Sequence, residues 1–198
     1  MEERKLKLVE NEPIVKIRDL CKQFDAVLAL DSVNLEIPEG KIIGLLGPNG
    51  SGKTTLMKIL AGLYTTYTGE VLIEGEKPGA KSKAIVSYLP DRPAFAMNNT
   101  PKDIMDIYVT FFEDFKTAKF MSLMERFEIK TDTTFKEMSK GMIDKVQISL
   151  AMSRDARLYL LDEPLGGVDV VARDNVLDAI LENFDSKGTI VVATHLIS

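Results

Sequence analysis

Apolar residues in the first part of the chain recur with the spacing of β-strands. Residues 13–17 and 32–37 are runs rich in Ile, Val and Leu, and Pro38-Glu39-Gly40 follows the second run as a turn. Residues 41–46 are almost wholly apolar, which is typical of a central strand covered on both faces. A glycine-rich stretch follows, and residues 54–62 then have helical spacing, with Leu56, Met57, Ile59 and Leu60 on the expected buried side.

Helical spacing replaces the β pattern between about residues 92 and 153. Thr100 is a candidate N-cap, followed by Pro101 at the first helical position and the helix-start carboxylate of Asp103. The residues that then recur at helical spacing are Ile104, Ile107, Tyr108, Phe111 and Phe112. We expect this stripe to pack in the core, and a groove for a partner is the alternative.

The β pattern returns after this insert. Residues 158–161 and 189–194 are apolar runs, and the helix expected between them has Val176, Leu177, Ile180 and Leu181 on one face. Two apolar strands joined by a helix predict a right-handed parallel βαβ unit. Ligands of such sheets bind beyond the carboxyl ends of the strands, and the polar motifs of this chain fall there.

Composition limits the classes of protein that the chain can be. A chain of 198 residues, 45% hydrophobic and 28% charged, is enough for one globular domain with a subdomain. Its net charge of -5 disfavours nucleic acid as a partner. The single cysteine, Cys21, cannot form an internal disulfide, which fits a reducing compartment. No apolar run approaches the roughly 20 residues that span a bilayer, so we expect a cytoplasmic chain that needs a partner for any role at a membrane.

The glycine-rich stretch satisfies the pattern G-x-x-x-x-G-K-[ST] and lies between a predicted strand and a predicted helix, as the pattern requires. Its residues, each expected to bind ATP together with the following Thr55, are Gly47, Pro48, Asn49, Gly50, Ser51, Gly52, Lys53 and Thr54. Glycines let successive backbone N–H groups turn toward phosphates, and the helix N-terminus adds its positive end. Lys53 is expected to bridge the β- and γ-phosphates, and Thr54 to bind Mg²⁺.

Two adjacent carboxylates, Asp162 and Glu163, end the strand at residues 158–161. We expect Asp162 to hold the metal, and Glu163 to orient or deprotonate the attacking water. A solvated turn is the alternative for this pair. Together with the loop, the pair predicts an α/β P-loop NTPase with a largely parallel sheet, an N-terminal antiparallel β subdomain and a helical insert.

With the loop at 47–54 and Leu161-Asp162-Glu163-Pro164, the sequence resembles the nucleotide-binding domain of ATP-binding-cassette (ABC) transporters over nearly its whole length. The resemblance implies one ABC ATPase domain over residues 1–198. Its ATP-binding core would cover about 1–91 and 154–198, and its helical subdomain about 92–153. It also implies ATP and Mg²⁺ as cofactors.

The same resemblance assigns roles to further residues. Phe24 stands where the family stacks an aromatic ring on adenine, and a core aromatic is the alternative. Residues 138–142, Met-Ser-Lys-Gly-Met, stand where the family has Leu-Ser-Gly-Gly-Gln and match at Ser139 and Gly141, which would bind the γ-phosphate of the opposite subunit. Asp169 matches the residue of the dimer-contacting loop. His195, which follows the last strand, matches the histidine that contacts the γ-phosphate and is expected to be catalytic with Glu163 and Lys53.

Two features depart from the family. Asp91 follows the strand at 84–90 where the family has glutamine, and it either contacts the metal site or only shapes the turn Asp91-Arg92-Pro93. The chain stops three residues after His195, where relatives continue, and a truncated form and a minimal cassette are both compatible with this.

The resemblance implies a function in which two such subunits, identical or different, close around ATP and drive a transmembrane permease, peripherally on the cytoplasmic face of the membrane. The Ser-Lys-Gly-Met form resembles export-type cassettes. The alternatives are a soluble ABC ATPase acting on nucleic acid or the ribosome, and a regulatory module that binds ATP with little hydrolysis.

Overall fold

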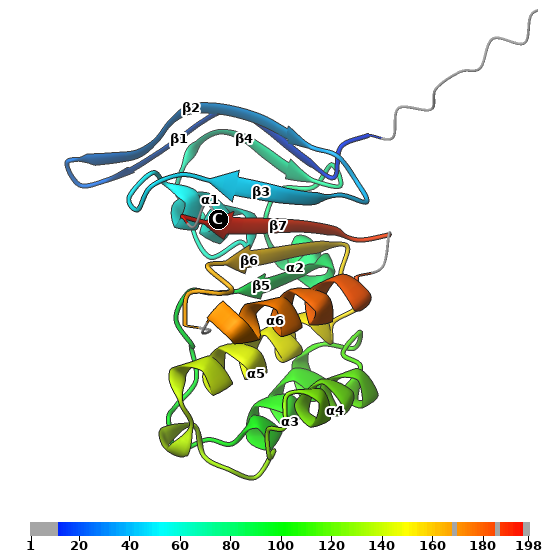
Figure 1. Cartoon of the computed structure of the whole chain (residues 1–198). Coiled ribbons are helices and arrows are strands. Elements are labelled where there is room, and N and C mark those ends of the chain that lie inside the picture. The colour runs from blue at the N-terminus through cyan, green and yellow to red at the C-terminus, as the bar shows by residue number, and fades with distance from the viewer. Residues whose placement is uncertain (1–11, 168–169, 185–186, 196–198) are drawn as a thin grey trace, which may run out of the picture.

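The computed structural model describes residues 12–167, 170–184 and 187–195, and in it two sheets and a group of helices form successive layers (Figure 1). An antiparallel sheet has the order β2-β1-β4, and a parallel sheet has the order β3-β7-β6-β5. The strands are β1 (Val15–Phe24), β2 (Val27–Ile37), β3 (Ile42–Leu46), β4 (Thr68–Ile73), β5 (Val86–Leu89), β6 (Leu158–Asp162) and β7 (Thr189–Thr194). The helices are α1 (Lys53–Leu60), α2 (Ala80–Ile85), α3 (Pro101–Phe111), α4 (Thr117–Arg126), the short 3₁₀ helix η1 (Phe135–Glu137), α5 (Lys140–Met152) and α6 (Val170–Glu182).

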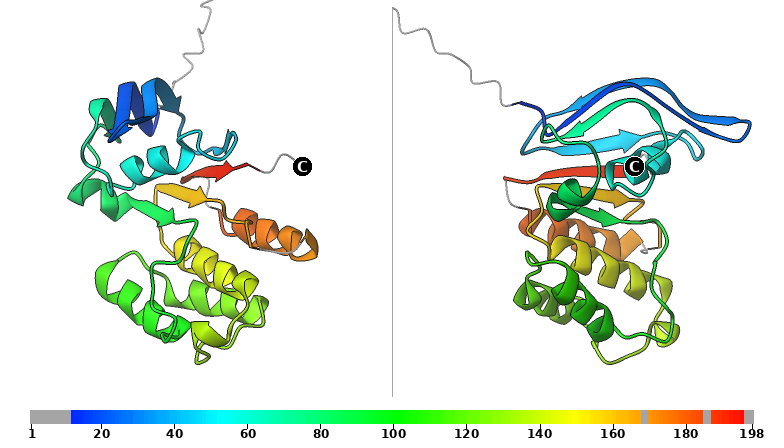
Figure 2. Two further views of the ribbon diagram at one scale, coloured as in Figure 1. Left: turned by 90° about the vertical axis from the view of Figure 1, so that its left-hand side faces the viewer. Right: turned by 180° about the vertical axis from the view of Figure 1, so that it is seen from behind.

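The parallel sheet separates two hydrophobic cores. All five residues of β6 are buried, and their side chains alternate between the two faces of the sheet. Leu158 and Leu160 pack in the core that also holds α1 and the antiparallel sheet. Tyr159 and Leu161 pack in the core that holds α3, α4 and α5, on the opposite side (Figure 2). A fully apolar strand is therefore needed here because both of its faces are covered.

The predicted fold class is confirmed in its main features. The sheet of β3, β5, β6 and β7 is parallel, the N-terminal strands β1 and β2 pair antiparallel, and α3 to α5 lie between β5 and β6 in the chain. The proposed division into a core of about 1–91 and 154–198 and a subdomain of about 92–153 stays a prediction.

Several local predictions were wrong. Residues 41–46 do not form a central strand, since β3 lies at the edge of its sheet and pairs with β7, with Ile42 and Leu46 exposed. Ala84 and Ile85 end α2, so the strand expected from residue 84 begins only at Val86. An apolar run shows that a strand forms, but its place in a sheet depends on partners far away in sequence.

The two helical stripes are also narrower than expected. Ile104 is buried, but Phe111 is 75% exposed, because α3 ends there and the extended Phe112 turns back toward the core. Ile107 is also exposed, so the core-packing interpretation of this stripe is wrong for these two residues. In α6 the buried positions include Val176 and Ile180, whereas Leu177 and Leu181 are exposed.

Candidate nucleotide-binding site

The strands of the parallel sheet all end at one edge, and this edge gathers most of the residues singled out from the sequence. The loop at 47–52 follows β3, Asp162 ends β6, His195 follows β7, and Asp91 follows β5 by two residues. A cleft of about 450 Å³ opens there. It is lined by Val27, Leu28, Ala29, Asn49, Gly50, Gly52, Lys53, Thr54, Thr55, Asp91, Lys140, Glu163, Gly166 and His195.

The glycine-rich loop wraps back on the lysine at the start of α1. The Nζ of Lys53 donates to the carbonyl oxygens of Gly47 at 2.6 Å and Pro48 at 3.0 Å. Gly52 has φ +90, and a Cβ placed on it would lie 2.5 Å from the carbonyl oxygen of Ala29 in the neighbouring hairpin. Only glycine fits this position, which holds the loop against β2 and leaves the lysine at the helix N-terminus.

Of the metal-binding candidates, Thr54 lines the cleft, and the buried Asp162 lies directly behind it. The hydroxyl of Thr54 donates to Oδ1 of Asp162 at 3.2 Å, across 108 positions of sequence. The other oxygen, Oδ2, is buried and has no hydrogen-bond partner among the described residues. Burial raises the pKa of Asp162, as do the charges of Asp91 and Glu163, while the hydrogen bond from Thr54 opposes the rise. The charge of Asp91 therefore acts on Asp162, which agrees with the position of Asp91 in the lining of the cleft.

Glu163 is held in an unusual backbone conformation. Its φ is +52, a left-handed value that is uncommon for a residue with a side chain. Its N–H donates to the carbonyl of Ala193 at 2.8 Å, which fixes this turn to the end of β7. Thr194 Oγ1 donates to one carboxylate oxygen at 3.2 Å, and His195 Nδ1 lies 2.8 Å from the other. The carboxylate therefore has a set direction into the cleft.

The start of α5 packs against the loop that follows Glu163. Ser139 caps the helix by accepting from the N–H of Met142 at 3.2 Å. The backbones of Gly141 and Gly167 approach so closely that a Cβ on Gly141 would lie 3.3 Å from the carbonyl oxygen of Gly167. A Cβ on Gly167 would in turn overlap the carboxylate of Asp144. Burial raises the pKa of Asp144, and this rise is opposed by the charge of Lys140 and a hydrogen bond from the Gly167 backbone.

The sequence predictions and the cleft overlap in large part. Nine predicted residues line it, namely Asn49, Gly50, Gly52, Lys53, Thr54, Thr55, Asp91, Glu163 and His195, while Gly47, Pro48 and Ser51 complete the loop. The ring of Phe24 packs edge-on to Tyr64, with centroids 5.3 Å apart, and lies outside the cleft lining. Asp169 lies outside the described residues. The residues missed from the sequence are Val27, Leu28, Ala29, Lys140 and Gly166.

Two of the five missed residues, Val27 and Leu28, had a signal in the sequence. Val27 and Leu28 are 65% and 53% exposed, at the tip of the hairpin between β1 and β2. An apolar pair at a hairpin tip is a possible contact surface, because such residues bury nothing in their own fold. The position of Lys140 in the lining of the cleft depends on how α5 packs on the sheet, which no local pattern reports.

Comparison with known proteins gives the family. A family model described as "ABC transporter" matches residues 30–166. The chain is 35% identical over 185 residues to the ABC transporter ATP-binding protein YtrB of Bacillus subtilis (strain 168), and this match covers 91% of the chain and 63% of YtrB. It is 29% identical to the SkfA peptide export ATP-binding protein SkfE of the same organism, over 92% of the chain and 79% of SkfE.

Solved structures of the same family are similar to this chain. A putative ABC transporter ATP-binding protein from Pyrococcus furiosus superposes with a TM-score of 0.79 at 26% identity, covering 93% of this chain and 92% of that one. The P-loop NTPase fold expected from the sequence is thereby confirmed. The family model covers well over half of the chain, and the chain therefore belongs to the ABC transporter family, whose ATP-binding domains are ATPases that drive transport.

Proposed function

We propose that this chain is the ATP-hydrolysing subunit of an ABC exporter, and that it works as a dimer on a transmembrane permease. The observation that carries the proposal is the contact of Thr54 with Asp162, which joins the phosphate loop to the acidic strand end beside an oriented Glu163. These are the two halves of an ATPase centre, one for the phosphates and one for the water.

Mg²⁺ fits the pair formed by Thr54 and Asp162. Oδ2 of Asp162 is a buried carboxylate oxygen that has no partner in the described part of the chain, and the hydroxyl of Thr54 lies beside the same carboxylate. Magnesium bound with ATP usually takes one or two protein oxygens, and phosphates and water supply the rest. Thr54 and Asp162 would hold the ion, with Asp91 contributing charge nearby. The bound ion would neutralise charge on the phosphates.

The chain's own residues divide the remaining work. The ammonium of Lys53 and the backbone N–H groups of residues 47 and 49–55 bind and orient the phosphates. The lysine leaves the carbonyls of Gly47 and Pro48 to do so. Glu163 takes the proton of the attacking water as general base. His195 and Thr194 hold its carboxylate, and His195 would meet the γ-phosphate through its other ring nitrogen. Phe24 would stack on adenine.

The second subunit would complete the site. Ser139 and Gly141 lie at the N-terminus of α5, where unpaired N–H groups and the helix dipole attract a phosphate. We assign this helix start, with Asp169, to the ATP of the opposite subunit. Two copies, or this chain and a similar one, would then close around two nucleotides.

The permease would dock in an apolar groove of about 570 Å³ beside the loop that carries Asp91. Its walls come from β5, the following loop and α3, and they include Tyr88, Pro90, Phe95 and Ile107. None of the helices in the described ranges is both long and apolar enough to cross a bilayer. A separate membrane subunit would therefore hold the chain peripherally at the membrane. The export direction is supported by the Ser-Lys-Gly-Met sequence and by similarity to SkfE.

The test is ATPase activity of the purified protein, wild type and Lys53→Ala, together with its recovery from membranes. Removal of the Lys53 charge should lower turnover by about a hundredfold or more, because the phosphate charge is no longer neutralised. The wild type should co-purify with a polytopic membrane protein. Equal turnover of the two proteins would overturn the site, and recovery with nucleic acid or ribosomes in place of a membrane protein would overturn the transport function.

A further inference from the structure

Tyr88 occupies a position between the apolar groove and the metal-binding carboxylate. In the parallel pairing of β5 with β6, Tyr88 is opposite Leu160. Side chains two residues apart on a strand share a face, so Tyr88, Leu160 and Asp162 lie on the same face of the sheet, the one that α1 covers. A tyrosine that leans along its strand reaches past Leu160 toward Asp162. The ring of Tyr88 also lines the groove.

The hydroxyl of Tyr88 and the carboxylate of Asp162 are both buried, and each has an oxygen without a hydrogen-bond partner among the described residues. Tyr88 Oη and Asp162 Oδ2 belong to the few buried side-chain atoms of the described residues that have no hydrogen-bond partner. The pairing of β5 with β6 places the two groups on one face of neighbouring strands, two residues apart along the strand direction. The Asp162 carboxylate also adds to the rise in the pKa of Tyr88 that burial causes.

Leaving both groups unpaired is costly, since a buried polar atom without a partner forfeits its hydration. By contrast, Oδ1 of the same carboxylate is held by Thr54. A hydrogen bond from Oη to Oδ2 would give both atoms a partner at once.

We propose that Tyr88 is a positioning residue for Asp162: its hydroxyl donates a hydrogen bond to Oδ2 of the carboxylate when the nucleotide and its metal are bound. This rests on the proposed ATPase function and extends it to a residue of β5. Outer partners of this kind fix the direction of a ligand oxygen and strengthen metal binding. Because the same ring lines the groove, a partner seated there would touch the group that sets the metal ligand.

The experiment measures binding of a fluorescent ATP analogue to wild type and Tyr88→Phe, first with EDTA and then across a Mg²⁺ titration. Phenylalanine keeps the ring that fills the sheet face and removes only the hydroxyl. We expect the half-saturating Mg²⁺ concentration to rise about tenfold in the variant, with unchanged binding in EDTA and an unchanged unfolding temperature. The ATPase rate at saturating Mg²⁺ should then recover most of the wild-type value.

The matched control is Tyr67→Phe, which removes a partly buried hydroxyl whose pKa is raised by burial alone. It should leave the Mg²⁺ titration unchanged. A second variant, Tyr88→Leu, should shift the titration like Tyr88→Phe even if it is less stable. Wild type without Mg²⁺-dependent ATP binding or turnover would refute the proposed function. Normal wild-type behaviour with a Tyr88→Phe titration that overlays it would refute the role of Tyr88 alone.

Discussion

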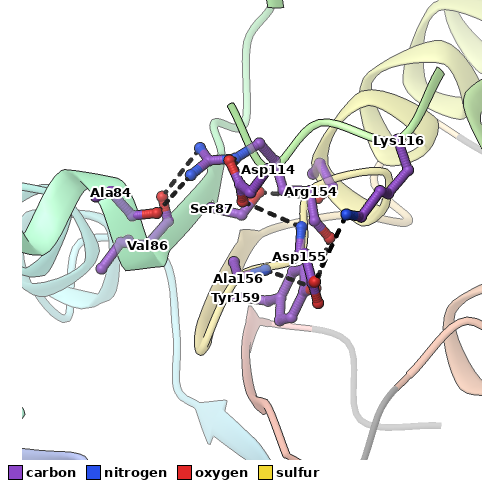
Figure 3. A network of polar contacts seen from close by, with 10 residues as sticks. Ala84, Val86, Ser87, Asp114, Lys116, Arg154, Asp155, Ala156 and Tyr159 are labelled. Atoms are coloured by element: carbon purple, nitrogen blue, oxygen red, sulfur yellow. Dashed lines mark hydrogen bonds and ion pairs between the residues drawn. The ribbon is translucent and has the colours of Figure 1, made fainter. Parts of the chain in front are cut away.

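Two buried polar regions of this molecule differ in how completely their groups are paired. At the junction of the helical insert with the sheet, the guanidinium of Arg154 is almost fully enclosed and uses all three nitrogens (Figure 3). It donates to both oxygens of Asp114, at 2.6 and 2.8 Å, and to the carbonyls of Ala84 and Val86. The guanidinium carbon Cζ also lies over the ring of Phe112, 3.8 Å from its centroid. At the ATP-site edge, Oδ2 of Asp162 and Oη of Tyr88 have no hydrogen-bond partner within the described ranges.

This difference separates groups that hold the structure from groups that await a ligand. Arg154 joins the loop after α3 to the start of β5, so it fixes the insert to the sheet. A buried charge of this kind is stable only if its hydrogen bonds are complete. Asp162 has a buried oxygen without a partner among the described residues, and the backbone of Glu163 is strained. Both features are typical of residues whose contacts are completed by substrate. Substitution of a fully paired group such as Arg154 should lower stability, whereas substitution of Asp162 or Glu163 should lower activity.

The largest effect is expected for Glu163→Gln, which keeps the size and hydrogen bonding of the side chain but cannot accept the proton of water. The hydrolysis rate should fall by about 10² to 10⁴, while ATP binding and the unfolding temperature stay near wild type. The closed dimer should accumulate with ATP and Mg²⁺, which size-exclusion chromatography detects.

A suitable control is Glu128→Gln, since Glu128 also has a left-handed backbone, with φ +55, but is exposed and far from the cleft in the fold. It should hydrolyse ATP at the wild-type rate. If Glu163→Gln also hydrolyses ATP normally, Glu163 is not the base. The inference that the groups at the ATP-site edge serve activity would then be wrong for this residue.

The next effect concerns Arg154→Met, which keeps much of the side-chain volume but removes the cation that faces Asp114 and the donor to two backbone carbonyls. Among the described residues, the carboxylate of Asp114 then keeps only the hydrogen bond from the N–H of Asp155. Breaking a buried ion pair from one side costs about 3 kcal/mol, equivalent to roughly 6 to 12 °C in the unfolding temperature of a chain this size. Thermal unfolding measures this. At temperatures where the variant is folded, ATP binding in EDTA should be retained.

Arg126→Met is the matched comparison, because Arg126 pairs with Glu182 at the surface, where the glutamate side chain is 64% exposed. Its loss should cost less than about 1 kcal/mol. If both substitutions lower the free energy of unfolding by the same amount, the complete set of hydrogen bonds at Arg154 does not stabilise the junction more than a surface ion pair does.

The ATP-site edge was the part of the molecule most accessible to prediction from sequence, because its chemistry is local. A strand, a glycine loop and a helix follow one another at residues 42–60, and Asp162 and Glu163 directly end an apolar strand. Each of these patterns needs only neighbouring residues. The contact between Thr54 and Asp162 could also be expected, since parallel strands end at a common edge.

The pairings that depend on register and packing could not be predicted. Tyr88 reaches Asp162 because β5 pairs with β6 in one particular register, and a shift of one residue would turn its ring to the other face. Arg154 meets Asp114 across 40 positions, and both lie in stretches that read as ordinary helix ends. The edge position of β3 likewise depends on which strands pair.

The smallest effect is expected at Asp91, which is exposed, lines the cleft and raises the pKa of Asp162 through its charge. The loop of Asp91 is fixed at Pro90, whose carbonyl accepts from Gln147 of α5 at 3.2 Å. Asp91→Asn removes a negative charge that attracts the metal, so the half-saturating Mg²⁺ concentration for hydrolysis should rise by about two- to fivefold, as for a charge at a partly exposed site. Asp91→Gln adds one methylene and the amide found in the family, so part of that loss should be recovered through its longer reach. The measurement is ATPase rate against free Mg²⁺ for wild type and both variants. Three superimposable curves would show that Asp91 only shapes the turn with Arg92 and Pro93, and that its charge has no effect on the metal site.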